Sequence, residues 1–252
     1  MLKKRIIPIQ LLMNDRLVKS TQFDNFRDVG DPVKSSSVYN SQYADELILL
    51  NIDRSSAGVE KLAKYIKAVS EVCFMPLAIG GGIRSFEDAR FLIKNGADKV
   101  VVNSLAYDAP NDLRKIAEHF GTQALVVGVD VRRGSFGYEL YSNCGGKRRP
   151  YDLLEHIEKA VKYGAGEIFI QSIDKDGMMS GYDIDLIKMV NEYVDLPVIA
   201  AGGSGNYDQL KDVFLQTNAS AVACGSLFNF SDSNPMRAKA FLGNYDLPFK
   251  KV

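Results

Sequence analysis

Small and polar residues follow several short apolar runs of this sequence, in a pattern that could bind anions. In the first half of the chain these residues are Gly81, Gly82, Asn103 and Ser104, and in the second half they are Gly202, Gly203, Gly225 and Ser226. Glycine lets backbone N–H groups approach an anion closely, and the N-terminus of a following helix adds positive potential. One Gly-Gly pair alone would be as typical of a simple turn, but its recurrence with a serine in both halves favours two phosphate sites.

Two aspartates lie where a carboxylate could transfer a proton. Asp130 ends the run Val126–Asp130, and Asp176, with Gly177 directly after it, follows the run Glu167–Ile173. A carboxylate between apolar walls has a raised pKa, which suits proton transfer near neutral pH. The alternative is a solvated turn aspartate that caps the next helix. We favour acid–base chemistry at Asp130, whereas both interpretations stay open at Asp176, because Asp-Gly is itself a turn signal. We also count Asp176 and Gly177 among the expected phosphate-binding residues.

Other kinds of catalysis need residue spacings that this sequence lacks. It has no His-x-x-x-His motif, no Cys/His ligand spacing and no Gly-x-Ser-x-Gly motif. His119 and His156 fall in predicted outer helices, where a histidine is usually a surface residue. Cys73, Cys144 and Cys224 are far apart and odd in number, which fits neither a disulfide framework nor a metal site. We therefore expect no metal, no cofactor and a cytoplasmic location.

The chain alternates apolar runs with amphipathic segments, and these elements must position the candidate residues. The runs are Arg5–Leu12, Glu46–Ile52, Leu77–Ile79, Lys99–Val102, Ala124–Val129, Glu167–Ile173, Val198–Ala200 and Ala221–Cys224. The amphipathic segments include Ala57–Val72, Phe86–Asn95, Asn111–Phe120, Asp152–Tyr163, Ile184–Tyr193 and Tyr207–Gln216. This rhythm predicts a parallel sheet with helical crossovers, either a (β/α)₈ barrel or a doubly wound open sheet. In a barrel, the site lies at the carboxyl ends of the strands, where the glycines and Asp130 fall.

An internal repeat favours the barrel over the open sheet. Glu46–Asp53 aligns with Glu167–Asp174, and at the same offset Pro76–Gly82 aligns with Pro197–Gly203. Two similar halves, each with four strand–helix units, are typical of a barrel with two-fold pseudo-symmetry. We expect one (β/α)₈ domain over residues 1–252, with half-barrels of about 1–122 and 123–252.

The overall composition excludes several classes of protein. Of the 252 residues, 46% are hydrophobic and 25% are charged, which is typical of soluble globular proteins. Lys+Arg 31 balances Asp+Glu 31, so no global positive charge recruits nucleic acid or an anionic membrane, although a local basic patch would escape this count. No apolar run approaches the roughly 18 residues of a membrane span. We expect a small-molecule ligand and no nucleic-acid or membrane partner.

Several motifs together resemble one known family from end to end of the chain. They are Lys4–Ile7, Asp24–Val33, Gly80–Ile83, Gly96–Lys99, Gly164–Glu167, Ser172–Gly177 and Ser180–Asp183. The sequence resembles the cyclase subunits of imidazole glycerol phosphate synthase, and the loop Phe23–Val33 distinguishes it from the sister isomerase barrel. The resemblance implies a heterodimer with a glutaminase subunit, whose ammonia passes through the barrel. It also implies a bis-phosphorylated ribonucleotide substrate, converted to imidazole glycerol phosphate and an aminoimidazole carboxamide ribonucleotide.

Four charged residues begin or directly precede apolar runs and therefore belong to the opposite, N-terminal face of the barrel. They are Arg5, Glu46, Lys99 and Glu167. Residues at this face usually serve stability, so a plain salt-bridge layer is one interpretation. The resemblance implies another, a gate through which ammonia enters, with Asp98 near the partner interface.

The first strand departs from the family pattern. The family has two catalytic aspartates, and Asp130 matches the second, but Leu11 occupies the place of the first and Asn51 that of a further aspartate. A leucine side chain can neither donate nor accept a proton. Lys19, which matches a family residue of the first loop, is retained.

Three neighbours of Leu11 could substitute for the missing acid. They are Gln10, Asn14 and Asp15, although Gln10 should point to the opposite face of the strand from Leu11. If none of them does, the chain is an ammonia conduit with weak or absent cyclase activity. That alternative resembles a divergent branch of the family, of the surface-polysaccharide type, in which a sugar-modifying synthetase receives the ammonia.

Overall fold

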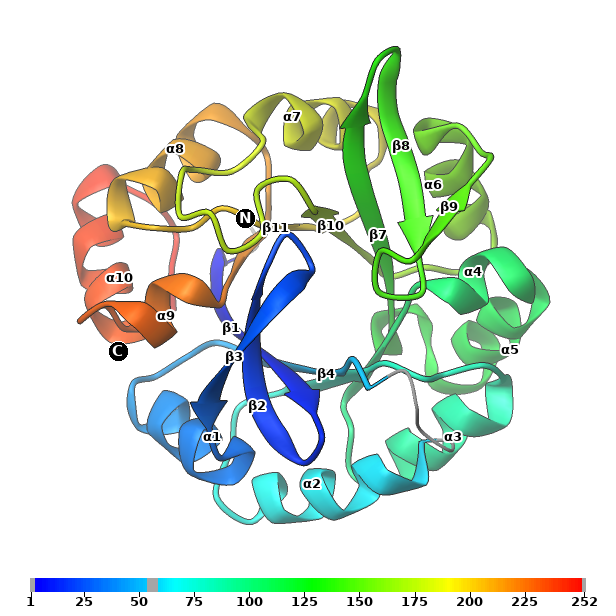
Figure 1. Cartoon of the computed structure of the whole chain (residues 1–252), viewed down its shortest axis with the longest axis horizontal. Coiled ribbons are helices and arrows are strands. Elements are labelled where there is room, and N and C mark those ends of the chain that lie inside the picture. The colour runs from blue at the N-terminus through cyan, green and yellow to red at the C-terminus, as the bar shows by residue number, and fades with distance from the viewer. Residues whose placement is uncertain (1–2, 54–58, 251–252) are drawn as a thin grey trace.

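Eight parallel strands close a barrel in the computed structural model, which describes residues 3–53 and 59–250 (Figure 1). In barrel order they are β1 (Arg5–Met13), β4 (Leu47–Asn51), β5 (Leu77–Gly80), β6 (Lys99–Val102), β7 (Leu125–Gly134), β10 (Glu167–Ser172), β11 (Val198–Ala201) and β12 (Ala221–Cys224). Each strand pairs in parallel with the next, and Arg5 to Pro8 of β1 pair with Ala221 to Cys224 of β12. This closure confirms the predicted (β/α)₈ barrel and excludes the open sheet.

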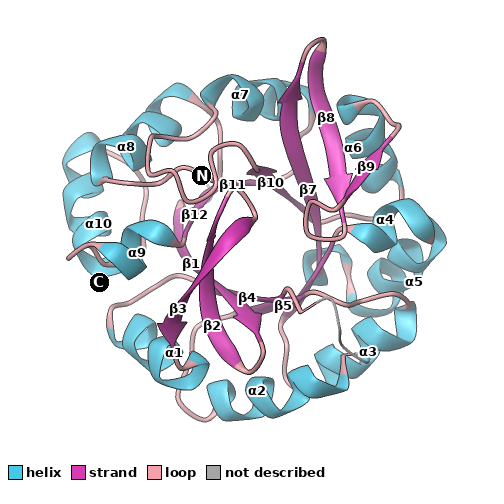
Figure 2. Ribbon diagram, in the orientation of Figure 1, coloured by secondary structure: helices cyan, strands magenta, loops and turns pink. Residues whose placement is uncertain are grey.

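Helices surround the barrel on its outside (Figure 2). Those that follow the strands in the described chain are α1 (Pro32–Ser41), α2 (Glu60–Ser70), α3 (Phe86–Lys94), α5 (Pro110–Phe120), α6 (Leu153–Lys162), α7 (Ile184–Tyr193), α8 (Tyr207–Gln216) and α10 (Pro235–Leu242). Their buried residues recur every three or four positions, as Leu62, Ile66 and Val69 do in α2, so one apolar stripe packs on the sheet. The expected helix over Ala57–Val72 is α2, and Ala57 and Gly58 lie outside the described residues.

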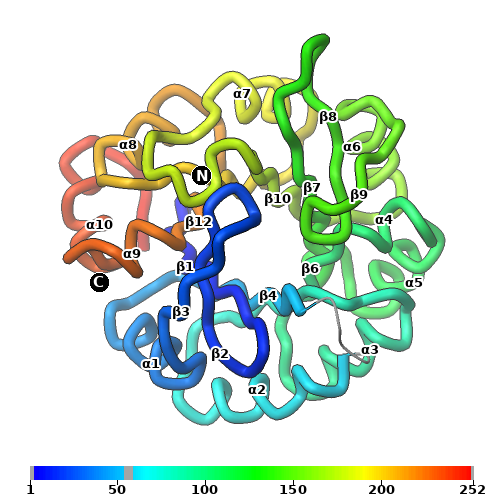
Figure 3. Tube along the Cα trace, viewed as in Figure 1, coloured from blue at the N-terminus to red at the C-terminus, as the bar shows by residue number. Residues whose placement is uncertain are grey.

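Two antiparallel hairpins extend the first and fifth strands of the barrel. Strand β1 continues into β2 (Arg16–Thr21) and β3 (Asp24–Gly30), and β7 continues into β8 (Gly137–Ser142) and β9 (Lys147–Arg149). The turn from β1 to β2 has positive φ at Asn14 and Asp15, which these residue types tolerate better than most others. In Figure 3 the hairpin β2–β3 crosses the barrel opening, and the β7–β8 arm rises beside it.

The barrel interior is apolar along most of its length. Its buried cluster is separate from the larger core between sheet and helices, and comprises Ile7, Ile48, Ala78, Val101, Val126, Phe169, Ile199, Ala201, Ala221 and Ala223. Several of these are alanines, so the interior is filled by a mixture of small and large side chains. No helix within the described ranges is long and apolar enough to cross a membrane.

Candidate functional site

A cavity of about 240 Å³ opens at the carboxyl ends of the barrel strands. The residues predicted for catalysis or phosphate binding all line it: Lys19, Gly81, Gly82, Asn103, Ser104, Asp130, Asp176, Gly177, Gly202, Gly203, Gly225 and Ser226. The fold gathers them because parallel strands bring their carboxyl ends to one rim. Their roles stay predictions, but their proximity in one pocket is a property of the structure.

The first glycine-rich cradle, made of Gly81, Gly82, Asn103 and Ser104, follows β5 and β6. Gly81 has φ +90°, and a Cβ atom there would lie 1.9 Å from the carbonyl oxygen of Asn51, so only glycine fits. Gly82 also has positive φ but faces open space. Ser104 begins the short helix α4 (Ser104–Asp108), directly after Asn103. All four residues line the pocket, and the lack of a side chain at Gly81 and Gly82 lets a ligand approach the backbone there.

The second cradle, made of Gly202, Gly203, Gly225 and Ser226, follows β11 and β12. Ser226 begins the short helix α9 (Ser226–Phe230). Its hydroxyl oxygen is buried and has no hydrogen-bond partner among the residues that the structure describes. A buried hydroxyl without a partner is costly, and a ligand oxygen in the pocket would satisfy it. The side chain of Lys19 passes close to Gly225, where a Cβ atom would lie 2.9 Å from its Cε.

Asp176 holds the hairpin β2–β3 over the pocket. Its buried carboxylate accepts hydrogen bonds from Lys19 Nζ at 2.7 Å and Ser20 Oγ at 2.7 Å, and Gln171 Nε2 donates a third at 3.2 Å. The backbone N–H of Gln22 donates to the carbonyl oxygen of Asp176 at 2.8 Å. Lys19 is thus a buried residue of strand β2 engaged in an ion pair. The carboxylate of Asp176 is hydrogen-bonded to side chains of the protein itself.

The pKa of Asp130 is raised into the range that suits acid–base chemistry at neutral pH. It lies on β7, and Asn103 Nδ2 donates a hydrogen bond to its carboxylate at 2.9 Å. Burial, with a smaller contribution from the negative charge of Asp176, raises the pKa of Asp130 to about 7. A carboxyl group with this pKa populates both protonation states at neutral pH and can accept or donate a proton.

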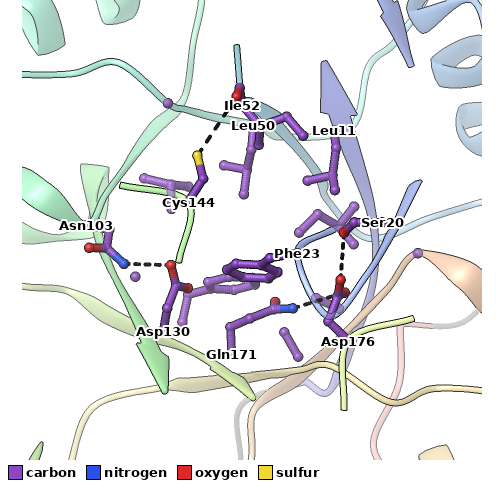
Figure 4. Close-up of a pocket in the computed structure, with 18 of the residues that line it drawn as sticks. Leu11, Ser20, Phe23, Leu50, Ile52, Asn103, Asp130, Cys144, Gln171 and Asp176 are labelled. Carbon is purple, nitrogen blue, oxygen red and sulfur yellow. Dashed lines mark hydrogen bonds between the residues drawn. The ribbon is translucent and has the colours of Figure 1, made fainter. Parts of the chain in front are cut away.

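The wall that faces Asp130 is apolar (Figure 4). Leu11, Leu50, Ile52 and Phe23 line the pocket there, and Leu11 points into it. No carboxylate from the three candidate positions near Leu11 lines the pocket in the described chain. Gln10 accepts a hydrogen bond from Ser36 on α1, and Asp15 accepts from Tyr65 and Lys64 on α2. Neither they nor Asn14 line the pocket, so the suggested substitutes face away from it.

Four ionic side chains form a closed ring at the opposite end of the barrel. Glu46 accepts from Arg5 at 2.7 Å and from Lys99 at 2.8 Å, and Glu167 accepts from Lys99 at 2.6 Å and from Arg5. Burial would raise the pKa of Glu167, but its hydrogen bonds and ion pairs with Arg5 and Lys99 outweigh burial and lower it. Asp98, beside Lys99, accepts a hydrogen bond from the backbone N–H of Leu77 at 2.8 Å.

One residue prediction was wrong. His156 was expected at the surface of an outer helix, but it is only 4% exposed and stacks on Tyr107 with ring centroids 3.9 Å apart. Its position in the helix indicated burial, because it lies three residues after the buried Leu153 and four before the buried Ala160. Sequence reasoning also missed Ser20, Phe23 and Gln171 as pocket residues. The first two belong to an unpredicted hairpin, and the third lies inside the otherwise largely apolar run Glu167–Ile173.

These observations define a class of protein: a (β/α)₈ barrel with a small-molecule pocket at the carboxyl ends of its strands and an ionic ring at the other end. Within this class, the chain belongs to the histidine biosynthesis protein family, whose model matches residues 5–233. It is also 39% identical, over 252 residues and 100% of both chains, to imidazole glycerol phosphate synthase subunit HisF of Alkaliphilus metalliredigens (strain QYMF). The family resemblance inferred from the motifs is confirmed.

Proposed function

We propose that this chain is the ammonia-accepting cyclase subunit of an imidazole glycerol phosphate synthase, working in the cytoplasm as a heterodimer with a glutaminase subunit. The observation that carries the proposal is one pocket with a glycine-rich cradle on each of two sides and Asp130 between apolar walls. A ligand with phosphates at both ends would fill both cradles. The similarity to a HisF subunit over the full chain supports the same substrate class.

The proposed chemistry assigns a separate task to each part of the pocket. Backbone N–H groups of the two cradles and the hydroxyl of Ser226 would hold the phosphates of the ribonucleotide. Lys19 would order the hairpin β2–β3 over the bound substrate through its buried ion pair with Asp176. Asp130 would be the catalytic residue, taking up protons as ammonia attacks and the ring closes.

Ammonia would enter at the ionic ring and travel through the apolar interior. Arg5, Glu46, Lys99 and Glu167 close that end, and uncharged side chains line the barrel beyond it. The glutaminase would dock at this end with Asp98 in the interface. Because each of the four charges is paired with two opposite charges, a plain stabilising layer is the competing interpretation of the ring. Lys99→Ala and Asp98→Ala distinguish the two: uncoupling of glutamine hydrolysis from ammonia delivery supports a gate, whereas lower stability alone supports the layer.

The decisive experiment measures turnover without the glutaminase. The purified chain is given the bis-phosphorylated ribonucleotide at saturating ammonium, and disappearance of the substrate is followed. Turnover that Asp130→Asn abolishes and Asp185→Asn leaves unchanged would support the proposal, since Asp185 is an exposed residue in the first turn of α7. Binding of the ribonucleotide without any turnover would contradict it.

A second candidate function is favoured by one specific observation, the apolar wall at Leu11. With Leu11 in the pocket and Gln10 and Asp15 bonded to outer helices, the first strand supplies no acid to the reaction. The chain would then conduct ammonia from the glutaminase to a sugar-modifying synthetase of surface-polysaccharide biosynthesis. Ammonia transfer in the assembled complex, with no turnover of the ribonucleotide, would support this function over the first.

A further inference from the structure

A cluster of polar and aromatic side chains lies between the short helix α4 and the hairpin β8–β9. Arg149 of β9 is buried and donates two hydrogen bonds to the carboxylate of Asp108, from Nη1 at 2.7 Å and from Nη2 at 3.0 Å. Its Nε donates to Ser142 Oγ at 2.6 Å, and its guanidinium lies 4.8 Å from the ring centroid of Tyr107. Paired hydrogen bonds of this kind fix orientation as well as distance. One arginine therefore ties the last two residues of α4, Tyr107 and Asp108, to the hairpin.

His156 of α6 holds the same end of α4 from another side. Its ring is stacked on Tyr107, with an angle of 5° between the ring planes. Burial, with smaller contributions from Lys159 and Arg149, lowers the pKa of His156 to about 4. The imidazole is therefore neutral at neutral pH, and the cation in contact with Tyr107 is Arg149.

The opposite end of α4 reaches the pocket. Asn103, which precedes the helix, donates from Nδ2 to Asp130 at 2.9 Å and to the carbonyl oxygen of Tyr141 at 3.3 Å. Ser104 accepts a hydrogen bond from the backbone N–H of Asn143 at 3.3 Å. A helix of five residues is about 7 Å long. A displacement of its clamped end therefore also moves the end that contacts Asp130.

We propose that Arg149 is a positioning residue of the pocket: by fixing Tyr107 and Asp108 it holds α4 so that Asn103 meets Asp130 and Ser104 keeps its place in the first cradle. The part that concerns phosphate rests on the proposed function, whereas the part that concerns Asn103 and Asp130 does not.

The second cradle has a looser contact at the end of its own short helix, α9. There the exposed Arg27 lies 5.9 Å from the ring centroid of Phe230, at the end of α9. Loss of Arg149 should therefore disturb one cradle and leave the other intact.

The test compares Arg149→Ala and Asp108→Asn with Arg148→Ala. Arg148 is the matched control, because it precedes Arg149 on β9 but is exposed and pairs outward with Glu139. In the folded full-length variants, NMR of the Asp130 carboxyl carbon gives its titration. Both test variants should raise the pKa of Asp130, because its charged form loses the N–H donated by Asn103, and the control should not.

Inorganic phosphate serves as the ligand probe, followed through backbone amide shifts. Gly82 and Ser104 report on the first cradle, and Gly203 and Ser226 report on the second. Phosphate affinity at the first cradle should fall about tenfold in Arg149→Ala and Asp108→Asn, as is typical when a supporting residue is lost, and stay unchanged at the second.

Two results would overturn the role of Arg149, and a third would contradict the proposed function. An unchanged Asp130 titration in both test variants would overturn the inference, and so would an equal loss of phosphate at both cradles, which indicates general loosening. Absence of phosphate from both cradles of the unmodified chain would contradict the proposed function, while the Asp130 titration would still decide the role of Arg149. If Arg149→Ala does not fold, the test uses Asp108→Asn alone. The side chain of Asp108 is 57% exposed, so its substitution removes no buried packing.

Discussion

The strands β1 and β7 make the same connection but supply different chemistry. Each runs past the barrel rim into an antiparallel hairpin, and each presents a side chain to the pocket, Leu11 from β1 and Asp130 from β7. Strand β7 contributes an ionisable group whose pKa is raised to about 7. Strand β1 contributes only part of an apolar wall. Two strands with the same connection can thus carry very different groups to one pocket.

The glycine-rich loops of the two halves differ in a related way. Gly82 and Gly203 correspond in the sequence repeat, and both have positive φ. A Cβ atom at Gly82 meets nothing within 4 Å, whereas one at Gly203 would lie 2.1 Å from the carbonyl oxygen of Gly181. The second cradle is packed tightly against the loop after β10, and the first is open on that side. Equivalent positions therefore carry different steric constraints.

Removal of the ionisable group of Asp130 should have the largest effect on turnover. Asp130→Asn keeps the size of the side chain and its contact with Asn103 but cannot transfer a proton, and general acid–base groups contribute about 10²–10⁴-fold. We expect a loss of kcat in this range at saturating ammonium, with the KM of the ribonucleotide little changed. A variant that keeps more than a tenth of the rate would show that β7 is no more essential to the chemistry than β1.

The fold was predictable because it depends on patterns that repeat. Apolar runs and helical periodicity located α2, α3 and α5 to α8 within a few residues, and the repeat distinguished a closed barrel from an open sheet. Helix α1 was missed because its sequence, PVKSSSVYNS, has few apolar residues, and Asp31 starts it by accepting the N–H groups of Val33 and Lys34. The hairpins were missed because their strands carry many polar residues and lack the long apolar runs that located the barrel strands. The division into half-barrels at about residue 122 stays a prediction.

The candidate site was predictable where a residue acts from the end of a barrel strand. The cradle glycines and Asp130 needed only the rule that strand ends meet at one rim. The ion pair between Lys19 and Asp176 could not be predicted, because it depends on how a hairpin folds back over the pocket. The same holds for the contact of Arg149 with Asp108, whose partners lie on separate elements.

Substitution of the two equivalent glycines should separate the cradles by stability. Gly203→Ala places a Cβ atom against a backbone oxygen at positive φ, so we expect a loss of about 3 kcal/mol or more in the free energy of unfolding. Gly82→Ala has only the conformational penalty, about 1 kcal/mol. Urea unfolding followed by circular dichroism measures both. Equal losses would mean that the steric difference between the halves has no energetic consequence.

An acid placed on β1 should restore part of the symmetry between the strands. Leu11→Asp puts a carboxyl group into the wall that faces Asp130, and we expect turnover with ammonium to rise about 10-fold to 10²-fold, the lower part of the range for a general acid or base. Leu11→Asn is the matched control, because it adds polarity without a titratable proton. If both variants behave alike, or if the aspartate variant binds substrate without a gain in rate, more of β1 than position 11 separates it from β7.

The smallest effect is a pH dependence of stability that arises on β7 and has no counterpart on β1. The pKa of Asp130 is about 7 in the folded chain, against an ordinary value of 3.8, so the folded state holds a proton that the unfolded state has released. The contribution of this group is complete below pH 3.8 and is lost as pH rises toward 7, because the unfolded state then gains more from ionisation. Between pH 5 and 7 the loss should be about 2 kcal/mol at most.

The variant Asp130→Asn removes this titration. The difference in unfolding free energy between variant and parent should therefore shift in favour of the variant as pH rises. The same difference for Leu11→Asn should be independent of pH. Urea midpoints measured at half-unit steps test this, and a flat difference for Asp130→Asn would mean that Asp130 is ionised throughout and that burial does not distinguish β7 from β1.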